Sequence, residues 1–289
     1  MIWENIISND FPEAVRKAKG VCVVPIGCIE KHGPHSPLGT DTIIATEVVK
    51  RAAEKEPVVV FPTMFFGEKS GAGEFPGTVI FSVETRWHIF KETCNEIYRN
   101  GFKKILFVNG HGGNKDMLGL FIRSMIQENP NILIFSVGTN GGWKKHDALA
   151  EIIADESLDY LTDSDRAEMQ DFLDKNKAVG HACLFETAKA YHYRPETVCI
   201  DRIAAESGDN IHRFDELSKH GITSPHSWAA NYPNSYTGAN DYALNERIAK
   251  AIAQFFEGKL AETFRFLKNE TISDEYHAEW LAKQHRLEY

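Results

Sequence analysis

Residues 104–114, KILFVNGHGGN, decide the fold, because a short apolar run ends there in a glycine-rich turn around a histidine. The run 104–108 has the length and composition of a buried strand, and residues 115–127 follow it with helical spacing. His111 therefore stands where a strand meets a helix, and its three neighbouring glycines let the backbone approach a metal or a substrate. A tight turn without a ligand is the alternative interpretation of this histidine.

The first apolar run of the chain repeats this arrangement. Residues 21–26 (VCVVPI) have the character of a buried strand, and a loop rich in glycine and proline separates them from the helical spacing of residues 42–53. Residues 58–61 form another run of β-branched side chains. Strands that alternate with helices in this way indicate βαβ units and a mainly parallel sheet.

The rest of the chain continues the alternation of helices and strands. The later elements are predicted as helix 83–99, strand 132–137, helix 182–190 and helix 241–266. The more polar stretch 141–177 is predicted to form helices and loops over the sheet edge, and 225–238 an ordered loop. The charged tail 269–289 contains enough apolar residues to dock, either on its own domain or on a neighbouring subunit.

Composition excludes several classes of protein. Lys and Arg number 32 against 41 Asp and Glu, and the formal net charge of −9 disfavours binding to nucleic-acid phosphates. The five cysteines form no CxxC pair, and residues 1–10 lack the basic region of a signal peptide, so reduced thiols in the cytoplasm are expected. No apolar run approaches the roughly 20 residues that span a membrane.

The loop at residues 27–41, GCIEKHGPHSPLGTD, contains the densest cluster of metal-capable side chains. Glu30 and His32 are two residues apart, so an extended backbone places both side chains on the same side. Asp41 returns after the Gly/Pro-rich part of the loop, and imidazole and carboxylate together favour zinc, manganese or iron over calcium or magnesium. An exposed polar loop is the alternative, but a further histidine, His35, and the similar pattern at His111 favour the metal site.

A third segment, GHACLFET at residues 180–187, contains His181 and Glu186. If a helix begins at His181, Glu186 lies more than one turn further on, so the two side chains need not share a face. Taken alone, this segment is an ordinary helix start with a charged residue.

Together these segments resemble the creatininase (creatinine amidohydrolase) family. The resemblance spans roughly residues 18–255, and any one of its motifs is weak, whereas four of them in order are specific. The matching residues are Pro25, Gly27, Glu30, His32, Gly33, His35, Pro37 and Asp41, then FPGT at 75–78, NGHGGN at 109–114, His181-Ala182 with Glu186-Thr187, and GAND at 238–241.

The resemblance implies a fold and an assembly. The fold would be a single-domain three-layer α/β/α sandwich with a mostly parallel central sheet, covering residues 1–268 and followed by the tail 269–289. The assembly would be a ring-like homo-oligomer such as a hexamer. No nucleic acid or membrane is expected as a partner.

The resemblance also implies two divalent metal ions per chain. Carried over by position, Glu30 and His111 would bind one ion and His32 the other. Asp41 would bridge the two ions, and Glu186 would complete the ligand set.

The implied activity is that of an amidohydrolase that cleaves a C–N bond in a small-molecule substrate, such as a cyclic amide or a formamide. Two cations about 3.5–4 Å apart would lower the pKa of a shared water, and the resulting hydroxide would attack an amide-type carbon. His181 is the candidate acid for the leaving nitrogen, because histidine titrates near neutral pH, and Glu186 is the other candidate catalytic residue. His35 is expected to be structural.

Two other functions are kept as alternatives. A peptidase that trims a modified precursor peptide predicts a wide groove, whereas the amidohydrolase predicts a small closed pocket. A non-catalytic metal-binding scaffold predicts that a metal ligand or His181 has been lost, and the sequence retains all of them.

Four positions depart from the members that hydrolyse creatinine. Those members carry Tyr and Glu after the strand-end histidine, where this chain has Gly112 and Gly113. They also carry a Trp-Asp pair where this chain has Lys177 and Ala178. We therefore expect the metal chemistry to be retained and the substrate pocket to differ.

Aromatic residues gather in the predicted loop at 225–238. Trp228, Tyr232 and Tyr236 either wall a pocket or, as is more common for such residues, pack in the interior or at an interface. Cys28 in the metal loop is expected to lie beside the ligands rather than among them.

Overall fold

The central sheet has four parallel strands in the order β2-β1-β3-β4. The computed structural model describes residues 1–68 and 70–284. The strands are β1 (Val21–Ile26), β2 (Val59–Val60), β3 (Lys104–Asn109) and β4 (Leu133–Gly138). β1 and β3 pair in register along their whole length, so both strands end at the same edge of the sheet. All four predicted strands are confirmed, although β2 is shorter than the predicted run 58–61.

Helices surround the sheet. They are α1 (Phe11–Lys17), α2 (Thr40–Lys55), α3 (Val83–Arg99), α4 (Asn114–Glu128), α5 (Lys145–Ala154), α6 (Asp163–Asp174), α7 (Leu184–Tyr193), α8 (Asp215–Lys219), α9 (Ser227–Asn231), α10 (Glu246–Asn269) and α11 (Ile272–Gln284). Helix α3 has the predicted bounds, because the Ser82 side chain caps it by accepting a hydrogen bond from the Thr85 backbone N–H.

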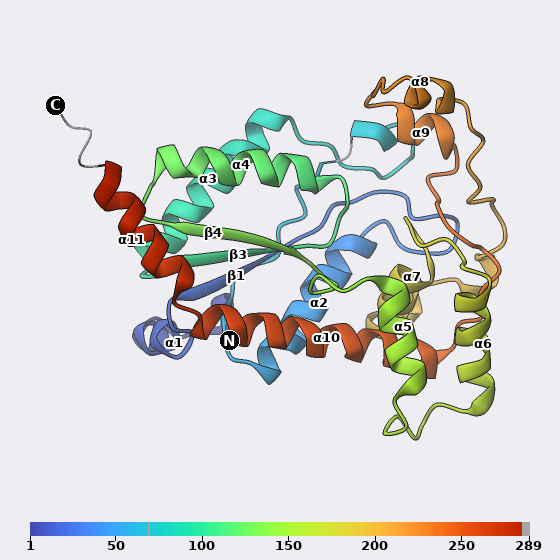
Figure 1. Cartoon of the computed structure of the whole chain (residues 1–289), viewed down its shortest axis with the longest axis horizontal. Helices are drawn as coiled ribbons and strands as arrows, with labels where there is room; N and C mark the ends of the chain where they lie inside the picture. The colour runs from blue at the N-terminus through green and yellow to red at the C-terminus, as the bar shows by residue number, and fades with distance from the viewer. Residues whose placement is uncertain (69, 285–289) are drawn as a thin grey trace.

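Successive residues of β1 face opposite layers of the molecule. The face that carries Val21 and Val23 packs on α2 and α10, and the face that carries Cys22 and Val24 packs on α3 and α4. Figure 1 shows α3 and α4 on one side of the sheet and α2 and α10 on the other. The fold is therefore the predicted α/β sandwich of three layers.

The structure corrects two helix predictions and one loop prediction in the C-terminal half of the chain. Helix α10 begins at Glu246 rather than at residue 241, because the Asn245 side chain accepts hydrogen bonds from the first backbone N–H groups of the helix. The predicted loop 225–238 contains the short helix α9. The helix predicted for 182–190 begins two residues later, at the start of α7.

Within the tail 269–289, residues Ile272–Gln284 form helix α11, and residues 285–289 lie outside the described part of the chain. The tail packs on its own domain: Lys104 Nζ, at the start of β3, lies 2.5 Å from Glu270 Oε1 and 2.8 Å from Asp274 Oδ2. Figure 1 shows α11 at the opposite end of the molecule from α5, α6 and α7. None of the helices that the structure describes has the length and apolar character that a membrane crossing requires.

Candidate metal centre

The carboxyl ends of β1 and β3 lie side by side and face the first turn of α2. The Gly110 N–H donates to the Ile26 carbonyl oxygen over 2.8 Å. A Cβ atom at Gly27 would lie 2.4 Å from the Thr42 nitrogen, and one at Gly110 would lie 2.7 Å from the Asp41 carbonyl oxygen. Only glycine fits this close approach, which brings Asp41 in the first turn of α2 to the ends of the strands.

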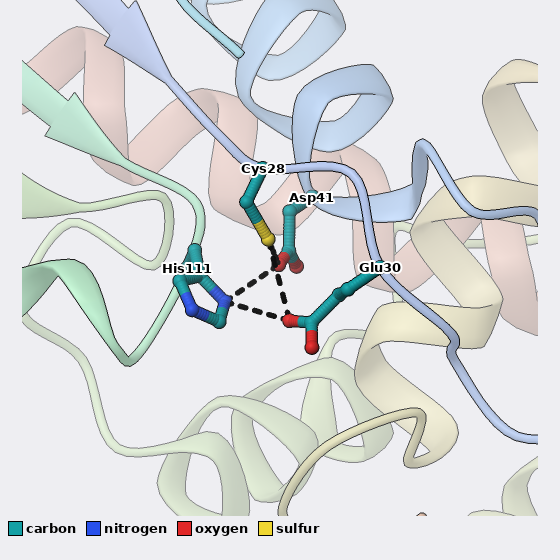
Figure 2. A group of neighbouring side chains, drawn as sticks. All are labelled: Cys28, Glu30, Asp41 and His111. Atoms are coloured by element: carbon teal, nitrogen blue, oxygen red, sulfur yellow. Dashed lines mark hydrogen bonds and ion pairs between the residues drawn. The ribbon is translucent and has the colours of Figure 1, made fainter. Parts of the chain in front are cut away.

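A first group of buried donor atoms comes from Glu30, Asp41 and His111 (Figure 2). His111 Nδ1 lies 2.9 Å from Glu30 Oε1 and 2.8 Å from Asp41 Oδ2. The Cys28 Sγ lies beside them, 3.3 Å from Glu30 Oε1 and 3.2 Å from Asp41 Oδ2. One donor atom from each of the four residues lies within 4.8 Å of the others, so the group can hold a metal ion.

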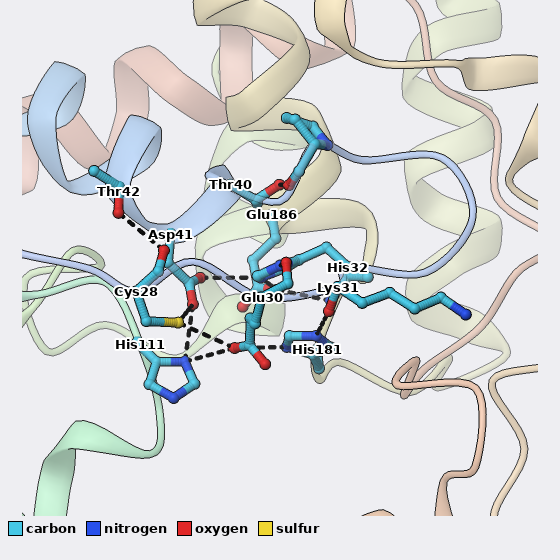
Figure 3. Close-up of polar contacts among 12 residues, drawn as sticks. Cys28, Glu30, Lys31, His32, Thr40, Asp41, Thr42, His111, His181 and Glu186 are labelled. Atoms are coloured by element: carbon cyan, nitrogen blue, oxygen red, sulfur yellow. Dashed lines mark hydrogen bonds and ion pairs between the residues drawn. The ribbon is translucent and has the colours of Figure 1, made fainter. Parts of the chain in front are cut away.

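A second group comes from His32, Asp41 and Glu186 (Figure 3). His32 Nε2 lies 3.1 Å from Asp41 Oδ1 and 3.9 Å from Glu186 Oε2. Asp41 therefore turns Oδ2 toward the first group and Oδ1 toward the second. The structure brings together all five residues that the sequence predicted as ligands: Glu30 and His111 share one group with Asp41, and His32 and Glu186 share another with it.

Backbone carbonyl groups orient two of the histidines. His32 Nδ1 lies 3.2 Å from the Glu30 carbonyl oxygen, and His181 Nε2 lies 2.7 Å from the Lys31 carbonyl oxygen. Because a carbonyl only accepts, these ring nitrogens donate, and the other nitrogen of each ring faces the cluster, as in metal-ligating histidines. Glu30, His32 and His181 form a third group of donor atoms within 4.8 Å, so His181 lies among the potential ligands, a position that the sequence interpretation missed.

The backbone around Ala182 positions Glu186. Ala182 adopts a left-handed conformation (φ 58°), which delays the start of α7 to Leu184. Glu186 consequently lies in the first turn of α7, and its Oε2 accepts a hydrogen bond of 2.8 Å from the Ala182 N–H. The carboxylate thus points back toward His32, and the case considered from the sequence, a helix that begins at His181, does not apply.

The electrostatics of the cluster fit the replacement of protons by metal ions. Burial lowers the pKa of His32 and His111, but the charges and hydrogen bonds of Asp41 and Glu30 outweigh it and raise these pKa values to about 9 and about 10. For the carboxyl groups of Glu30 and Asp41, burial alone would raise the pKa. The histidines instead lower the pKa of Glu30 to about 2 and hold the pKa of Asp41 well below its usual range.

In the metal-free protein, two imidazolium ions therefore balance two buried carboxylates, which would be costly to bury unpaired. Metal ligation requires deprotonated imidazole, so each bound cation would replace a proton. Carboxylate and imidazole donors at these positions fit two divalent cations, with Asp41 common to both.

The two remaining histidines near the centre are neutral. Burial, reinforced by the charge of His32, lowers the pKa of His181 to about 4. Burial also lowers the pKa of His35 to about 4. His35 Nε2 lies 2.9 Å from the hydroxyl of Thr187 and takes no part in the three donor groups, in agreement with the structural role expected for it.

A cavity of about 490 Å³ opens over these donor groups. Trp228 stands edge-on to the His181 ring, with the ring centroids 5.3 Å apart. Tyr236 is fully buried instead and packs on His35. The cavity is lined by Asp41, Glu68, Gly71, His111, Gly112, Gly113, Lys145, Gly180, His181, Glu186, Pro225, Trp228 and Thr237. Of the three candidate aromatic residues, Trp228 is the one that walls a pocket.

Lys145 is a residue of the cavity wall that sequence reasoning did not identify. Its Nζ lies 3.8 Å from Glu186 Oε1 and 3.5 Å from Cys183 Sγ. In the sequence it is one of two successive lysines before a helix, and nothing there separates it from an exposed lysine. The packing of α5 on α6 and α10 brings it to the metal-capable cluster.

Similar proteins include both small-amide and peptide hydrolases. The creatinine amidohydrolase of Pseudomonas putida is 34% identical over 34% of this chain and 41% of that protein. The mycofactocin precursor peptide peptidase of Mycolicibacterium smegmatis is 32% identical over 42% of this chain and 47% of that protein. The chain thus spans less than half the length of each of these two relatives.

The comparison with solved structures concerns the fold alone. A mutant creatininase of the Zn-Zn type has a TM-score of 0.70 at 19% identity, over 93% of this chain and 98% of that one. The family model described as Creatininase: Creatinine amidohydrolase matches residues 4–262. Because this match covers most of the sequence, the chain belongs to the creatininase family.

Proposed function

We propose that this protein is a hydrolase that uses two divalent cations to cleave a carbon–nitrogen bond in a small cyclic amide or formamide. The observation that carries the proposal is the orientation of Asp41, whose two carboxylate oxygens face two different donor groups. A carboxylate so placed would serve as a ligand to two cations, and paired cations are a common device for hydrolysis.

The donor set supports zinc, manganese or iron as the metal. Glu30 and His111 would hold one ion, and His32 and Glu186 the other. Histidine and carboxylate donors suit these metals, whereas magnesium and calcium prefer oxygen ligands alone. When bound, the two cations would lower the pKa of a water molecule and polarise the scissile carbonyl group.

The residues of the chain would supply proton transfer and orientation. His181 is neutral, and its Nδ1 lies 3.8 Å from Glu30 Oε1, so this nitrogen would accept the proton that the attacking water loses and deliver it to the leaving nitrogen. The Lys31 carbonyl holds the opposite ring nitrogen and fixes the tautomer. The Ala182 N–H fixes the orientation of the Glu186 carboxylate by donating a hydrogen bond to it.

The substrate is proposed to differ from creatinine. A Cβ atom at Gly113 would lie 2.5 Å from His111 Nε2, so the position cannot accept a glutamate without moving His111. At Gly112 no atom of the described residues lies within 4 Å of an added Cβ, and creatinine-hydrolysing members carry a tyrosine at this position of the cavity wall. The changed wall supports another small amide or a formamide.

A second candidate function is removal of residues from a modified precursor peptide. It is favoured by the peptidase from Mycolicibacterium smegmatis, which matches a larger share of this chain than the creatinine amidohydrolase does. The cavity over the metal centre adjoins another of about 640 Å³, and two adjoining cavities provide room for a substrate with two arms.

Elemental analysis of the purified protein tests the proposal, with Asp41→Ala as the variant and Asp116→Ala as the matched control. Asp116 also lies in the first turn of a helix that follows a strand, but it is exposed. We expect two divalent ions per chain in the wild type and in Asp116→Ala, and weakened binding of both ions in Asp41→Ala. A screen of cyclic amides, formamides and short peptides then separates the two candidate functions.

The opposite results would reject the proposal. Wild-type protein without metal, or Asp41→Ala with a full complement, would remove the dinuclear mechanism. Full metal content with no turnover of any substrate class would favour a non-catalytic metal-binding scaffold.

A further inference from the structure

A second cavity of about 640 Å³ lies between the carboxyl ends of β3 and β4 and the helices α5 and α7. It shares His111, Gly112, Lys145 and Glu186 with the cavity over the metal-capable groups. These four residues therefore form the boundary between the two cavities. A substrate positioned over the metal centre could extend an arm into the second cavity.

The most unusual residue of this second cavity is Lys189 on α7. Only 3% of its surface is exposed, yet its side chain lines the cavity. Within residues 1–68 and 70–284, no oxygen atom forms a hydrogen bond or an ion pair with its ammonium group, which lies 5.1 Å from the centre of the Phe256 ring. A buried ammonium without a carboxylate partner is costly, so a structural role alone does not account for this lysine.

Two more lysines face the same cavity. Lys145 comes from α5, with 23% of its side chain exposed, and Lys115 comes from the exposed first turn of α4. Glu186 is the acidic residue that lines this cavity, and its charge would be engaged by a metal ion. Three lysines thus face one carboxylate, in a chain whose formal net charge is −9.

Neutral hydrogen-bonding groups complete the lining. Asn109 ends β3, and Thr139 and Asn140 follow β4, so all three lie at the carboxyl edge of the sheet. This combination of one buried and two more accessible ammonium groups with amides and a hydroxyl matches the requirements of a carboxylate or a phosphate, which accept several hydrogen bonds at once.

We propose that this second cavity binds an anionic group of the substrate, a carboxylate or a phosphate, with Lys189 and Lys145 as its charged partners. The proposal rests on the proposed function in one respect, since it assigns the anionic group to the substrate that is hydrolysed in the adjoining cavity over the metal-capable groups. Lys189 would act as a binding residue, and its ammonium would gain the partner that the protein itself does not provide. The substrate class would accordingly narrow to amides that carry an acidic arm.

Calorimetric titration of the intact, metal-loaded protein with acetate, acetamide and inorganic phosphate tests the proposal. Acetamide has nearly the shape of acetate without its charge. Lys189→Met is the main variant, because methionine fills a similar volume, and Lys145→Met is measured in parallel on a different helix. Lys144→Met, at the exposed neighbouring lysine, is the matched control.

We expect the wild type and Lys144→Met to bind acetate or phosphate and not acetamide, and each of the other two variants to bind the anion about tenfold more weakly or worse. The stronger of the two anions identifies the charged group. Any direct binding of the anion to the metal ions is common to all four proteins, so the difference between them isolates the lysines. We also expect Lys189→Met to unfold at a higher temperature, because it removes a buried unpaired charge.

Equal anion affinities in the wild type and in both Lys189→Met and Lys145→Met would overturn the inference, as would equal binding of acetate and acetamide. Metal content measured on the same samples separates this failure from failure of the proposed function. Two bound ions without lysine-dependent anion binding would reject only the anion site. Lysine-dependent anion binding in a protein that holds no metal would reject only the dinuclear hydrolase.

Discussion

The two ends of strand β3 carry buried charge in two different ways. At its amino end, Lys104 Nζ has Glu270 Oε1 at 2.5 Å and Asp274 Oδ2 at 2.8 Å, and the Glu270 carbonyl oxygen lies 3.1 Å away. At its carboxyl end, the cationic groups that the described residues place within 2.8–3.1 Å of Glu30 and Asp41 are histidines. The protein completes the first cluster with a permanent cation and the second with groups that can exchange a proton for a metal.

This difference distinguishes a structural cluster from a functional one. A lysine remains charged over the whole physiological range, so the amino-end cluster is complete as soon as α11 packs on the sheet. Histidine can give up its proton, so the carboxyl-end cluster can be emptied of protons and filled with metal ions. Burial and short distances occur at both ends and do not by themselves identify a site.

Replacement of a glutamate by glutamine should affect catalysis at the carboxyl end of β3 and not at its amino end. In Glu30→Gln we expect kcat/KM for the hydrolysed substrate to fall by about 10³-fold, because a lost ligand weakens an ion that contributes several kcal/mol. In Glu270→Gln we expect kcat/KM to remain unchanged. Steady-state kinetics and metal analysis of both variants check the comparison, which fails if the two variants lose activity alike.

The affinity of the carboxyl-end cluster for metal should depend steeply on pH. His32 and His111, with pKa values of about 9 and about 10 in the metal-free protein, must both lose a proton when two ions bind. Affinity for the pair of ions should therefore rise about a hundredfold for each pH unit from pH 7 to 9, ten for each proton. Competition with a metal-buffering chelator at several pH values measures this slope, and a flat profile would contradict the assignment of these histidines as ligands.

The stability of the metal-free protein should fall as the pH rises. The folded pKa values of His32 and His111 exceed the ordinary value of 6.5, so their stabilising contribution is complete below about pH 6.5 and is lost as the pH rises through 9 to 10. The metal-loaded protein should not show this loss. Urea unfolding with and without a chelator, across pH 6 to 10, tests the difference between the two states.

Removal of the Lys104 ammonium group should lower the stability of the fold and leave metal binding unchanged. In Lys104→Met we expect the free energy of unfolding to fall by about 2 kcal/mol, because Glu270 is left buried without its cation. The effect is smaller than for a fully buried pair, since 51% of the Asp274 side chain is exposed. Urea denaturation measures the loss, and metal content should remain that of the wild type; a loss of bound metal would show that the two ends are coupled.

The smallest effect is expected from Asp274→Asn. This substitution leaves Lys104 with Glu270 and removes only a half-exposed carboxylate, so the free energy of unfolding should fall by about 0.5 kcal/mol. The same denaturation experiment measures it. A loss as large as that of Lys104→Met would show that the amino-end cluster needs both carboxylates.

Sequence alone predicted the elements whose signals are local. Residues 21–26 and 83–99 have the predicted bounds, because their apolar patterns match a buried strand and an amphipathic helix. The grouping of Glu30, His32 and Asp41 with His111 came instead from the resemblance to the creatininase family. The register of β1 and β3, which ends both strands at the same edge of the sheet, agrees with that grouping.

Sequence did not predict the features that depend on packing. The left-handed backbone at Ala182 is uncommon for a residue with a side chain, so the place where α7 begins, and with it the direction of Glu186, could not be read from the pattern. Lys189 looks like an ordinary helical lysine until α7 is packed against α10. Helix α10 begins after the cap at Asn245, five residues later than the start predicted at residue 241.

The thiol of Cys28 provides a way to measure local opening at the carboxyl-end cluster. Its Sγ is fully buried against Asp41 and Glu30, and burial together with these two carboxylates raises its pKa well above the ordinary value. Alkylating reagents react with the thiolate, so we expect Cys28 to react only in molecules whose structure has opened locally around it. The rate at which a reagent alkylates Cys28 therefore measures how often this region opens. Metal ions that stabilise the closed arrangement should lower this rate in the absence of substrate.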